Sequence, residues 1–132
     1  PYTKVKDAKK ILLVVITSDR GLCGPFNSNI IKATNALLID TYAEQHKEGN
    51  VSFLCIGKKG YDLLSKRYNT VNGDFSTLFH GVNFDKVKVA AEYCMQAFVD
   101  GTYDVVDIVY NEFKNVATQV VQKERFLPIQ PT

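Results

Sequence analysis

The sequence predicts a three-layer α/β/α sandwich, built around a mixed, mostly parallel sheet of about five strands with the last strand antiparallel. Continuous apolar, β-branched runs alternate with segments that have the apolar spacing of helices, which favours parallel strands covered on both faces. The last two predicted strands are joined by a connection too short for a crossover, so we expect them to be antiparallel. The length of 132 residues suits one domain of this Rossmann-like class, and we take residues 1–132 as that domain.

The first half of the chain contains two predicted buried strands separated by a long helix. Ile11 to Thr17 reads ILLVVIT, an uninterrupted apolar run, and Val51 to Ile56 reads VSFLCI. Between them, apolar residues at helical spacing predict one helix from about Phe26 to Gln45. Pro25 suits the first turn of that helix, and Gly49 with the asparagine after it suits its end.

A short helix and a weak strand follow the second buried strand. The segment Gly57 to Gly60 (GKKG) turns the chain into a helix on which Tyr61, Leu64 and Tyr68 share one face. Thr70 to Leu78 is expected to hold a short edge strand, and it contains an Asn-Gly-Asp turn signal.

The second half predicts one more helix and a pair of strands. Asn83 can cap a helix that runs from Phe84 to about Asp100. Its apolar residues repeat at intervals of four, three and four positions: Val87, Ala91, Cys94 and Phe98. Asp104 to Phe113 alternates as a strand, and Val116 to Phe126 pairs back on it as a hairpin. The first of these strands is expected to place Val105 and Val109 on one face and Val106, Ile108 and Tyr110 on the other.

This topology has a geometric consequence for the two ends of the domain. Parallel strands all begin at the same end of a sheet, and a final antiparallel strand finishes there. The chain should therefore enter and leave the domain at one end. A domain with this property can be inserted into a longer element without disturbing it.

Composition excludes several classes of protein. The net charge is only +2 and both signs are scattered, which argues against a dedicated nucleic-acid binder. The apolar run from Ile11 to Ile16 is far shorter than the roughly 20 residues of a membrane span. The three cysteines, Cys23, Cys55 and Cys94, form no C-x-x-C pair, so we expect neither a disulfide framework nor a zinc site. A reducing, intracellular compartment fits this usage, with each cysteine a small buried apolar residue.

The turn after the first strand, Ser18 to Gly24, is where α/β folds bind ligands. Its backbone N–H groups could hold an anion. It nevertheless lacks the lysine and hydroxyl of a phosphate loop, and its glycine spacing does not match a dinucleotide-binding turn. The alternative is a structurally demanding turn in which Asp19 and Arg20 pair with each other or with neighbours. A phosphoacceptor at Asp19 is disfavoured, because that chemistry needs several carboxylates and a lysine around a metal.

Other candidate catalytic groups are dispersed along the chain. His46 lies near the end of a helix and His80 in a loop, and nothing in the sequence groups them with Cys23, so both are read as surface residues. There is no serine elbow of the G-x-S-x-G type and no metal-ligand spacing. Three carboxylates on the polar face of the long helix are read as solvated charges: Asp40, Glu44 and Glu48.

Several short segments resemble the γ subunits of F-type ATP synthases, and they occur in the order in which that family has them. Thr17 to Asn27 (TSDRGLCGPFN) resembles the S-D-R-G-L-C-G signature of the family, although Pro25 stands where a small residue is expected. Ile56 to Gly60, Val109 to Phe113 and Leu127 to Ile129 resemble its I-G-x-K-G, V-Y-N-x-F and L-P-[IL] segments. The signature turn consists of Ser18, Asp19, Arg20, Gly21, Leu22, Cys23 and Gly24.

The resemblance implies a non-catalytic central-stalk, or rotor, domain that couples proton-driven rotation of the c-ring to ATP synthesis or hydrolysis on other subunits. It implies contacts with the ε subunit, the c-ring and the α and β subunits. It implies no cofactor, metal, nucleic acid or direct membrane insertion, and a location peripheral to the energy-transducing membrane, at the cytoplasmic face of a bacterial plasma membrane. A small-ligand or nucleotide-binding α/β domain is the alternative function.

The resemblance also implies that two long coiled-coil helices flank this domain in the family. Neither is found in the sequence, whose only methionine is Met95 and which opens with Pro1. We therefore expect the chain to be the globular domain of a longer protein.

Overall fold

The computed structural model describes residues 8–17, 26–73, 84–115 and 118–129. The signature turn, together with His80 and the predicted cap Asn83, lies outside these ranges. Over the described residues the elements follow one another as β1 (Ile11–Ile16), α1 (Phe26–Asp40), α2 (Ala43–Lys47), β2 (Val51–Ile56), α3 (Lys58–Leu64), β3 (Val71–Asn72), α4 (Phe84–Val99), β4 (Val105–Asn115) and β5 (Thr118–Leu127).

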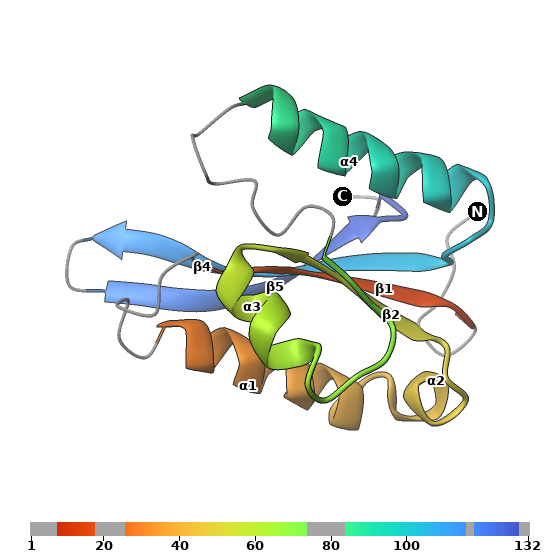
Figure 1. Ribbon diagram of the computed structural model, residues 1–132, viewed down its shortest axis with the longest axis horizontal. Coiled ribbons are helices and arrows are strands. Elements are labelled where there is room, and N and C mark those ends of the chain that lie inside the picture. Colours follow the sequence, from red (N-terminus) through yellow and green to blue (C-terminus); the bar gives the residue numbers. More distant parts are fainter. Residues whose placement is uncertain (1–7, 18–25, 74–83, 116–117, 130–132) are drawn as a thin grey trace.

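Within the described residues the strands form one five-stranded sheet in the order β3-β2-β1-β4-β5. Adjacent strands pair in parallel, except for β4 and β5, which are antiparallel. Helix α4 covers one face, and α1, α2 and α3 cover the other (Figure 1). The predicted three-layer sandwich, mostly parallel with an antiparallel last strand, is confirmed.

Strand β1 lies in the middle of the sheet because its side chains are apolar on both faces. Ile11, Leu13 and Val15 pack with α1 residues such as Ile30 in one core cluster. Leu12 and Val14 pack on the opposite side, in a second cluster with α4. A central strand covered by helices on both sides requires this uninterrupted apolar run.

The strands and the last helix lie where the sequence places them, within a few residues. β4 begins one residue after its predicted start, and β5 covers Thr118–Leu127 rather than residues 116–126. Val105 and Val109 belong to the α1-side cluster, while Val106 and Ile108 pack on the α4 side, as predicted. The described part of the predicted edge-strand segment, residues 70–73, contains the two-residue strand β3, and residues 74–78 lie outside the described ranges.

The prediction of one continuous helix from residue 26 to 45 is wrong. Helix α1 ends at Asp40, and α2 begins at Ala43. The Tyr42 backbone leaves helical geometry, with φ −117° and ψ 30°. The N–H of Tyr42 reaches back to the carbonyl of Leu37, an i to i−5 bond that closes the end of α1. This break turns the fully buried Tyr42 side chain into the core.

The chain enters and leaves the sheet at the same end, as predicted. Ile11, the first residue of β1, lies opposite Val105, the first residue of β4. Leu127, the last residue of β5, lies opposite Val106. In Figure 1, β1 begins and β5 finishes toward the right-hand side of the sheet. Across the described residues, the helices are all too short or too polar to cross a membrane.

Candidate functional site

The carboxyl end of β1 leads into the signature turn, and the structure describes the chain up to Thr17 at this point. Thr17 is buried, and its N–H donates to the carbonyl of Ile56 at 2.8 Å. Its Oγ1 accepts a hydrogen bond from the N–H of Gly60 at 2.7 Å. Thr17, the residue before the signature turn, is thus fastened to the last residue of β2 and to the first turn of α3.

Two glycines of the I-G-x-K-G segment make this fastening possible. Gly57 has a φ of +103°, and a Cβ there would lie 2.0 Å from the carbonyl oxygen of Thr17. A Cβ at Gly60 would lie 2.8 Å from Thr17 Oγ1. Glycine is required at both positions because the two chain segments approach so closely. The resemblance identified this segment, and the structure gives its physical reason.

The described residues hold no group of three or more His, Cys, Asp or Glu side chains that could bind a metal ion. His46 is exposed on α2, as predicted for a surface residue. Its ring lies edge-on to the ring of Tyr68, with 5.6 Å between the two ring centroids. Asp40, Glu44 and Glu48 are exposed, also as predicted.

The two described cysteines are buried, as predicted. Cys55 lies on the α1 side of the sheet and Cys94 on the α4 side. Burial raises the pKa of Cys55 to about 12 and that of Cys94 to about 11. Both thiols are therefore protonated and unreactive near neutral pH. Cys23 and Asp19 lie in the signature turn, outside the described residues.

A buried charged cluster, which we call the Asp107 cluster, was missed by the sequence analysis. It consists of Asp107 on β4, Arg125 on β5 and Tyr42 between α1 and α2. Arg125 Nε donates to Asp107 Oδ1 at 2.6 Å, and the Tyr42 hydroxyl donates to Asp107 Oδ2. The side chains of Asp107 and Arg125 are only 10% and 9% exposed, respectively.

The environment of Tyr42 keeps its hydroxyl neutral. Burial raises the pKa of Tyr42, and the adjacent Asp107 carboxylate raises it further. The charged Arg125 opposes this effect only in part. A signal was available in the sequence: an aspartate in the middle of a strand buried on both faces needs a partner. The sequence did not reveal that these partners are Arg125 and Tyr42, because they are 18 and 65 residues away from Asp107.

A second polar arrangement, the β1 brace, holds the segment that leads into β1. The Asp104 carboxylate accepts hydrogen bonds from the N–H groups of Lys9 and Lys10, both at 2.9 Å. The carbonyl of Lys10 accepts in return from the N–H of Asp104 at 2.8 Å. From the other side, Gln45 Nε2 on α2 donates to the carbonyl of Ala8 at 2.9 Å. We define the brace as Asp104, Gln45 and residues 8–10.

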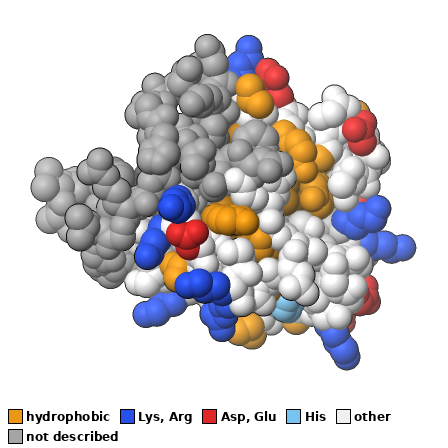
Figure 2. All heavy atoms as spheres, in the orientation of Figure 1, with side chains coloured by type: hydrophobic (Ala, Val, Ile, Leu, Met, Phe, Trp, Pro, Cys, Tyr) orange, Lys and Arg blue, Asp and Glu red, His pale blue; other side chains and the backbone are white. Residues whose placement is uncertain are grey.

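Surface charge does not gather into a single patch on the face that Figure 2 shows. Lysine and arginine side chains occupy several separate parts of it, with acidic side chains among them. This distribution agrees with the mixed charge of the sequence and differs from the clustered basic surface of a nucleic-acid-binding domain.

Comparison with known proteins identifies relatives along the whole chain. The family model described as ATP synthase matches residues 1–132. A protein of Cytophaga hutchinsonii named ATP synthase gamma chain is 47% identical over 129 residues, which are 98% of this chain and 44% of that protein. The ATP synthase gamma chain of Flavobacterium johnsoniae is 45% identical over 98% of this chain and 43% of its own length. The chain thus spans less than half the length of these relatives.

Solved structures with the same fold come from the same kind of assembly. A chain in the central stalk and c-ring structure of the Tetrahymena thermophila mitochondrial ATP synthase superposes with a TM-score of 0.63 and 32% identity, over 92% of this chain and 50% of that one. A chain in the rotor of the Euglena gracilis mitochondrial ATP synthase gives a TM-score of 0.64 at 21% identity, over 92% and 40%, which supports the fold alone.

The family model covers every residue, and the relatives named above match nearly the whole chain with more than two-fifths of positions identical. The order of short segments that suggested the γ subunit is therefore part of an alignment that runs through the domain. The chain belongs to the ATP synthase family, in which these relatives are the γ chains.

Proposed function

We propose that this chain is the globular domain of a central-stalk subunit, and that it acts in a rotary ATP synthase as a body that transmits torque. The observation that carries the proposal is the common end of the sheet at which β1 begins and β5 finishes. A domain connected at one end can ride on a pair of adjacent helices and turn with them. We also propose that residues 1–132 form one such domain, carried between two long helices of a longer protein.

The interactions at that end suit a mechanical role. The β1 brace ties residues 8–10 to β4 through Asp104 and to α2 through Gln45. The Asp107 cluster ties β5 to β4 and to the end of α1. Because α2 follows Tyr42 directly, the two arrangements are linked through one short segment. Force applied to either connection is passed into the sheet rather than absorbed by a loose end.

This chain is proposed to carry no active site of its own. The chemistry of the complex, ATP synthesis driven by proton flow, would take place on other subunits while this domain turns. The alternative, a nucleotide-binding domain, is less favoured because the relatives are ATP synthase gamma chains, the related Tetrahymena thermophila structure is of a central stalk and c-ring, and the turn after β1 lacks a phosphate-loop sequence. If that alternative held, millimolar ATP would raise the melting temperature of the chain.

The proposed partners are those of a rotor: the c-ring below, the α and β subunits above, and the ε subunit beside the domain. The related Tetrahymena thermophila structure includes the c-ring, and a second Euglena gracilis structure includes F1 and the c-ring. We propose the same neighbours here, and a location peripheral to the energy-transducing membrane, on the cytoplasmic face in a bacterium. The ε contact rests on the resemblance, and titration of the full-length protein with purified ε should give a saturable complex.

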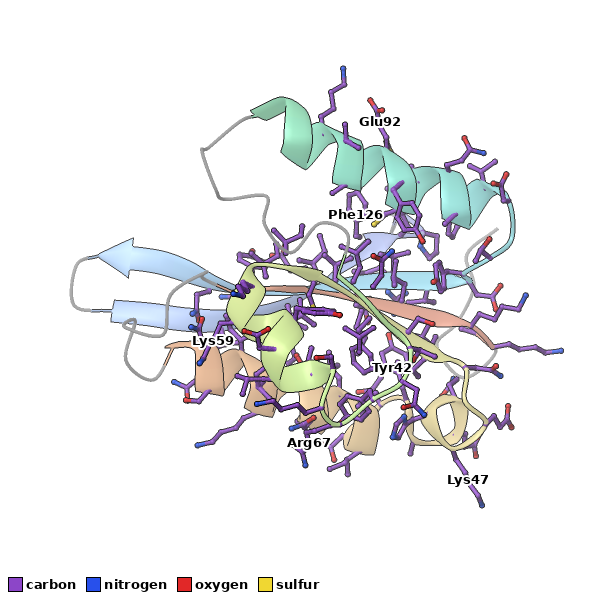
Figure 3. All side chains as sticks on the ribbon, in the orientation of Figure 1. Tyr42, Lys47, Lys59, Arg67, Glu92 and Phe126 are labelled. Carbon is purple, nitrogen blue, oxygen red and sulfur yellow. The ribbon has the colours of Figure 1, made fainter. Side chains whose placement is uncertain are left out.

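The rotor proposal is tested by watching this domain move in the assembled complex. Lys47 is exposed on α2 and points away from the body of the domain (Figure 3), so Lys47→Cys offers a site for a bead or dye. Replacing Cys23 with serine, in a complex whose other accessible cysteines have also been replaced, restricts labelling to this site, since Cys55 and Cys94 are buried thiols with raised pKa values. With the catalytic subunits fixed to a surface, added ATP should drive rotation of the label.

A matched label on an exposed residue of a catalytic subunit should remain still in the same preparation. Rotation of the Lys47 label that stops when ATP is withdrawn supports the proposal. A label at Lys47 that stays fixed while the complex hydrolyses ATP would show that this domain belongs to the stationary part.

A further inference from the structure

The short helix α2 is anchored in the domain by two buried side chains. Among residues 41–49, Tyr42 is 0% exposed and Gln45 is 8% exposed, and every other residue is exposed to solvent. The two anchors are three positions apart, the spacing at which residues share one side of a helical turn. A helix of five residues is not stable by itself in water, so α2 depends on what Tyr42 and Gln45 bind.

The two anchors bind parts of the chain that are far apart in the sequence. The Tyr42 hydroxyl donates to one oxygen atom of the Asp107 carboxylate, and Arg125 of β5 donates to the other. Gln45 Nε2 donates to the carbonyl of Ala8, 37 residues away, at 2.9 Å. One anchor therefore connects α2 to the strand by which the chain leaves the sheet, and the other connects it to the segment by which the chain enters.

The turn after α2 makes a second connection to the entering segment. The N–H of Asn50 donates to the carbonyl of Gln45 at 2.8 Å, and the N–H of Ile11 donates to the carbonyl of Asn50 at 2.9 Å. Ala8 and Ile11 are thus both held by α2 and the turn that follows it. Displacement of α2 would break the bond to Ala8 directly and, through Asn50, would weaken the bond at the start of β1.

We propose that α2 is a strap that couples the segment entering β1 to the strand β5 by which the chain leaves. The strap has a docked state with both anchors bound and an undocked state with both released, because a five-residue helix cannot hold one anchor in place after losing the other. Weakening the Asp107 end therefore releases Ala8, and weakening the Ala8 end releases Tyr42 by the same factor. The proposal stands on these contacts alone and does not depend on the rotor function.

Hydrogen exchange of the 132-residue chain, followed by NMR, tests the coupling from the leaving strand to the entering segment. Tyr42→Phe removes the hydroxyl and keeps the ring. Exchange of the Ile11 and Asn50 amides should become about fivefold faster relative to the Thr17 amide, which is bonded at the other end of β1. Tyr68→Phe removes a tyrosine hydroxyl that donates to the side chain of α1 at 2.7 Å, and as the matched control it should leave this ratio unchanged.

The reverse direction is measured at the Nε–H of Arg125, which is bonded to the same carboxylate as Tyr42. Gln45→Met removes the amide that binds Ala8 and keeps an unbranched side chain of similar length. Exchange of the Arg125 Nε–H should become about fivefold faster relative to the Thr17 amide. Lys47→Met introduces the same residue at an exposed position of α2 and should change nothing.

Faster exchange in both directions, with both control variants unchanged, supports the strap. The proposal is overturned if either Tyr42→Phe or Gln45→Met affects only its own end of α2. It is also overturned if the Thr17 amide accelerates equally, because the whole domain has then loosened, or if a control variant gives the same effect. If Tyr42→Phe does not fold, the Gln45→Met measurement decides alone, since the coupling is reciprocal.

Discussion

Asp107 compensates the buried positive charge of Arg125 on the α1 side of the sheet. Its carboxylate, on a residue only 7% exposed, accepts from Tyr42 and from Arg125 Nε and so uses both of its oxygen atoms. A buried ion pair of this kind is weak evidence for net stabilisation. Removing only one member of the pair is nevertheless costly, because the other member is then an uncompensated charge in the interior.

Asp107→Asn should therefore destabilise the fold by about 3 kcal/mol, because Arg125 keeps its charge after losing its counter-ion. Urea denaturation gives the free energy of unfolding. Glu92→Gln removes a carboxylate from the exposed Lys88–Glu92 pair, whose side chains are 64% and 57% exposed, and serves as the matched control. It should cost about 0.5 kcal/mol or less. Equal losses in the two variants would contradict the role given to Asp107.

The raised pKa of Tyr42 predicts a loss of stability in alkaline solution. Burial and the Asp107 charge hold the folded pKa of Tyr42 above its usual value of 10.0. Above pH 10 the unfolded chain then releases the Tyr42 proton while the folded chain keeps it, so the free energy of unfolding falls as pH rises. One such group contributes a slope that approaches about −1.4 kcal/mol per pH unit well above pH 10 and averages about −1 kcal/mol per pH unit between pH 10 and 11. Tyr42→Phe should make the measured slope between pH 10 and 11 shallower by about that amount, and identical slopes would refute it.

The connection between β2 and α3 depends on close approach of two backbones rather than on side-chain packing. Gly57 combines a φ of +103° with a virtual Cβ 2.0 Å from the carbonyl oxygen of Thr17. Gly49, after α2, has a similar φ of +77° but nothing within 4 Å of its virtual Cβ. The two glycines therefore set a positive φ with free space around the Cβ against a positive φ with a Cβ that meets the backbone of Thr17.

Gly49→Ala should cost about 1–2 kcal/mol, the penalty of a left-handed conformation for a residue with a Cβ. Gly57→Ala should cost clearly more, because the chain must also move away from Thr17 and break the bond from Gly60 N to Thr17 Oγ1. Thermal denaturation of both variants gives the comparison. The close-approach account fails if the two substitutions lower the melting temperature equally.

The strands and most of the helices could be predicted because their signals are local. The runs at residues 11–16 and 51–56 are apolar on every face, and such runs have few alternatives to a strand inside a parallel sheet. The stripe on α4 repeats at helical spacing, which made its bounds accurate to one residue. The antiparallel pairing of β4 and β5 followed from a connection too short for any crossover.

The features that were missed depend on contacts between distant segments. The break between α1 and α2 contains no glycine or proline that would signal it in the sequence. It is produced by the Tyr42 side chain, which turns into the core and bonds to Asp107. The β1 brace joins residues 94 and 95 positions apart. Neither arrangement leaves a pattern in any short window of sequence. The signature turn itself, recognised by resemblance, lies outside the residues that the structure describes.

The arrangement of the sheet decides how the domain can be connected to the rest of a larger protein. β1 and β5 are separated in the sheet by β4 alone, and successive strands lie about 4.8 Å apart. The chain therefore enters and leaves within roughly 10 Å, comparable to the spacing of two packed helices. This spacing, rather than any individual contact, makes the domain suitable to be carried on a helical pair.

Pairs of spin labels can measure how close the two chain ends of the domain lie to each other. Lys9 and Ile129 are exposed, at either end of the described chain, and cysteines there can carry nitroxides after Cys23 is replaced by serine. Lys58, exposed at the start of α3 beyond the far end of β2, provides the comparison position. A six-residue strand adds about 20 Å between the two ends of the sheet. The Lys9–Ile129 distance should therefore be narrow and distinctly shorter than the Lys9–Lys58 distance. If the two distances were equal, or their order reversed, the chain would leave the domain at the opposite end, and a pair of adjacent helices could not carry it.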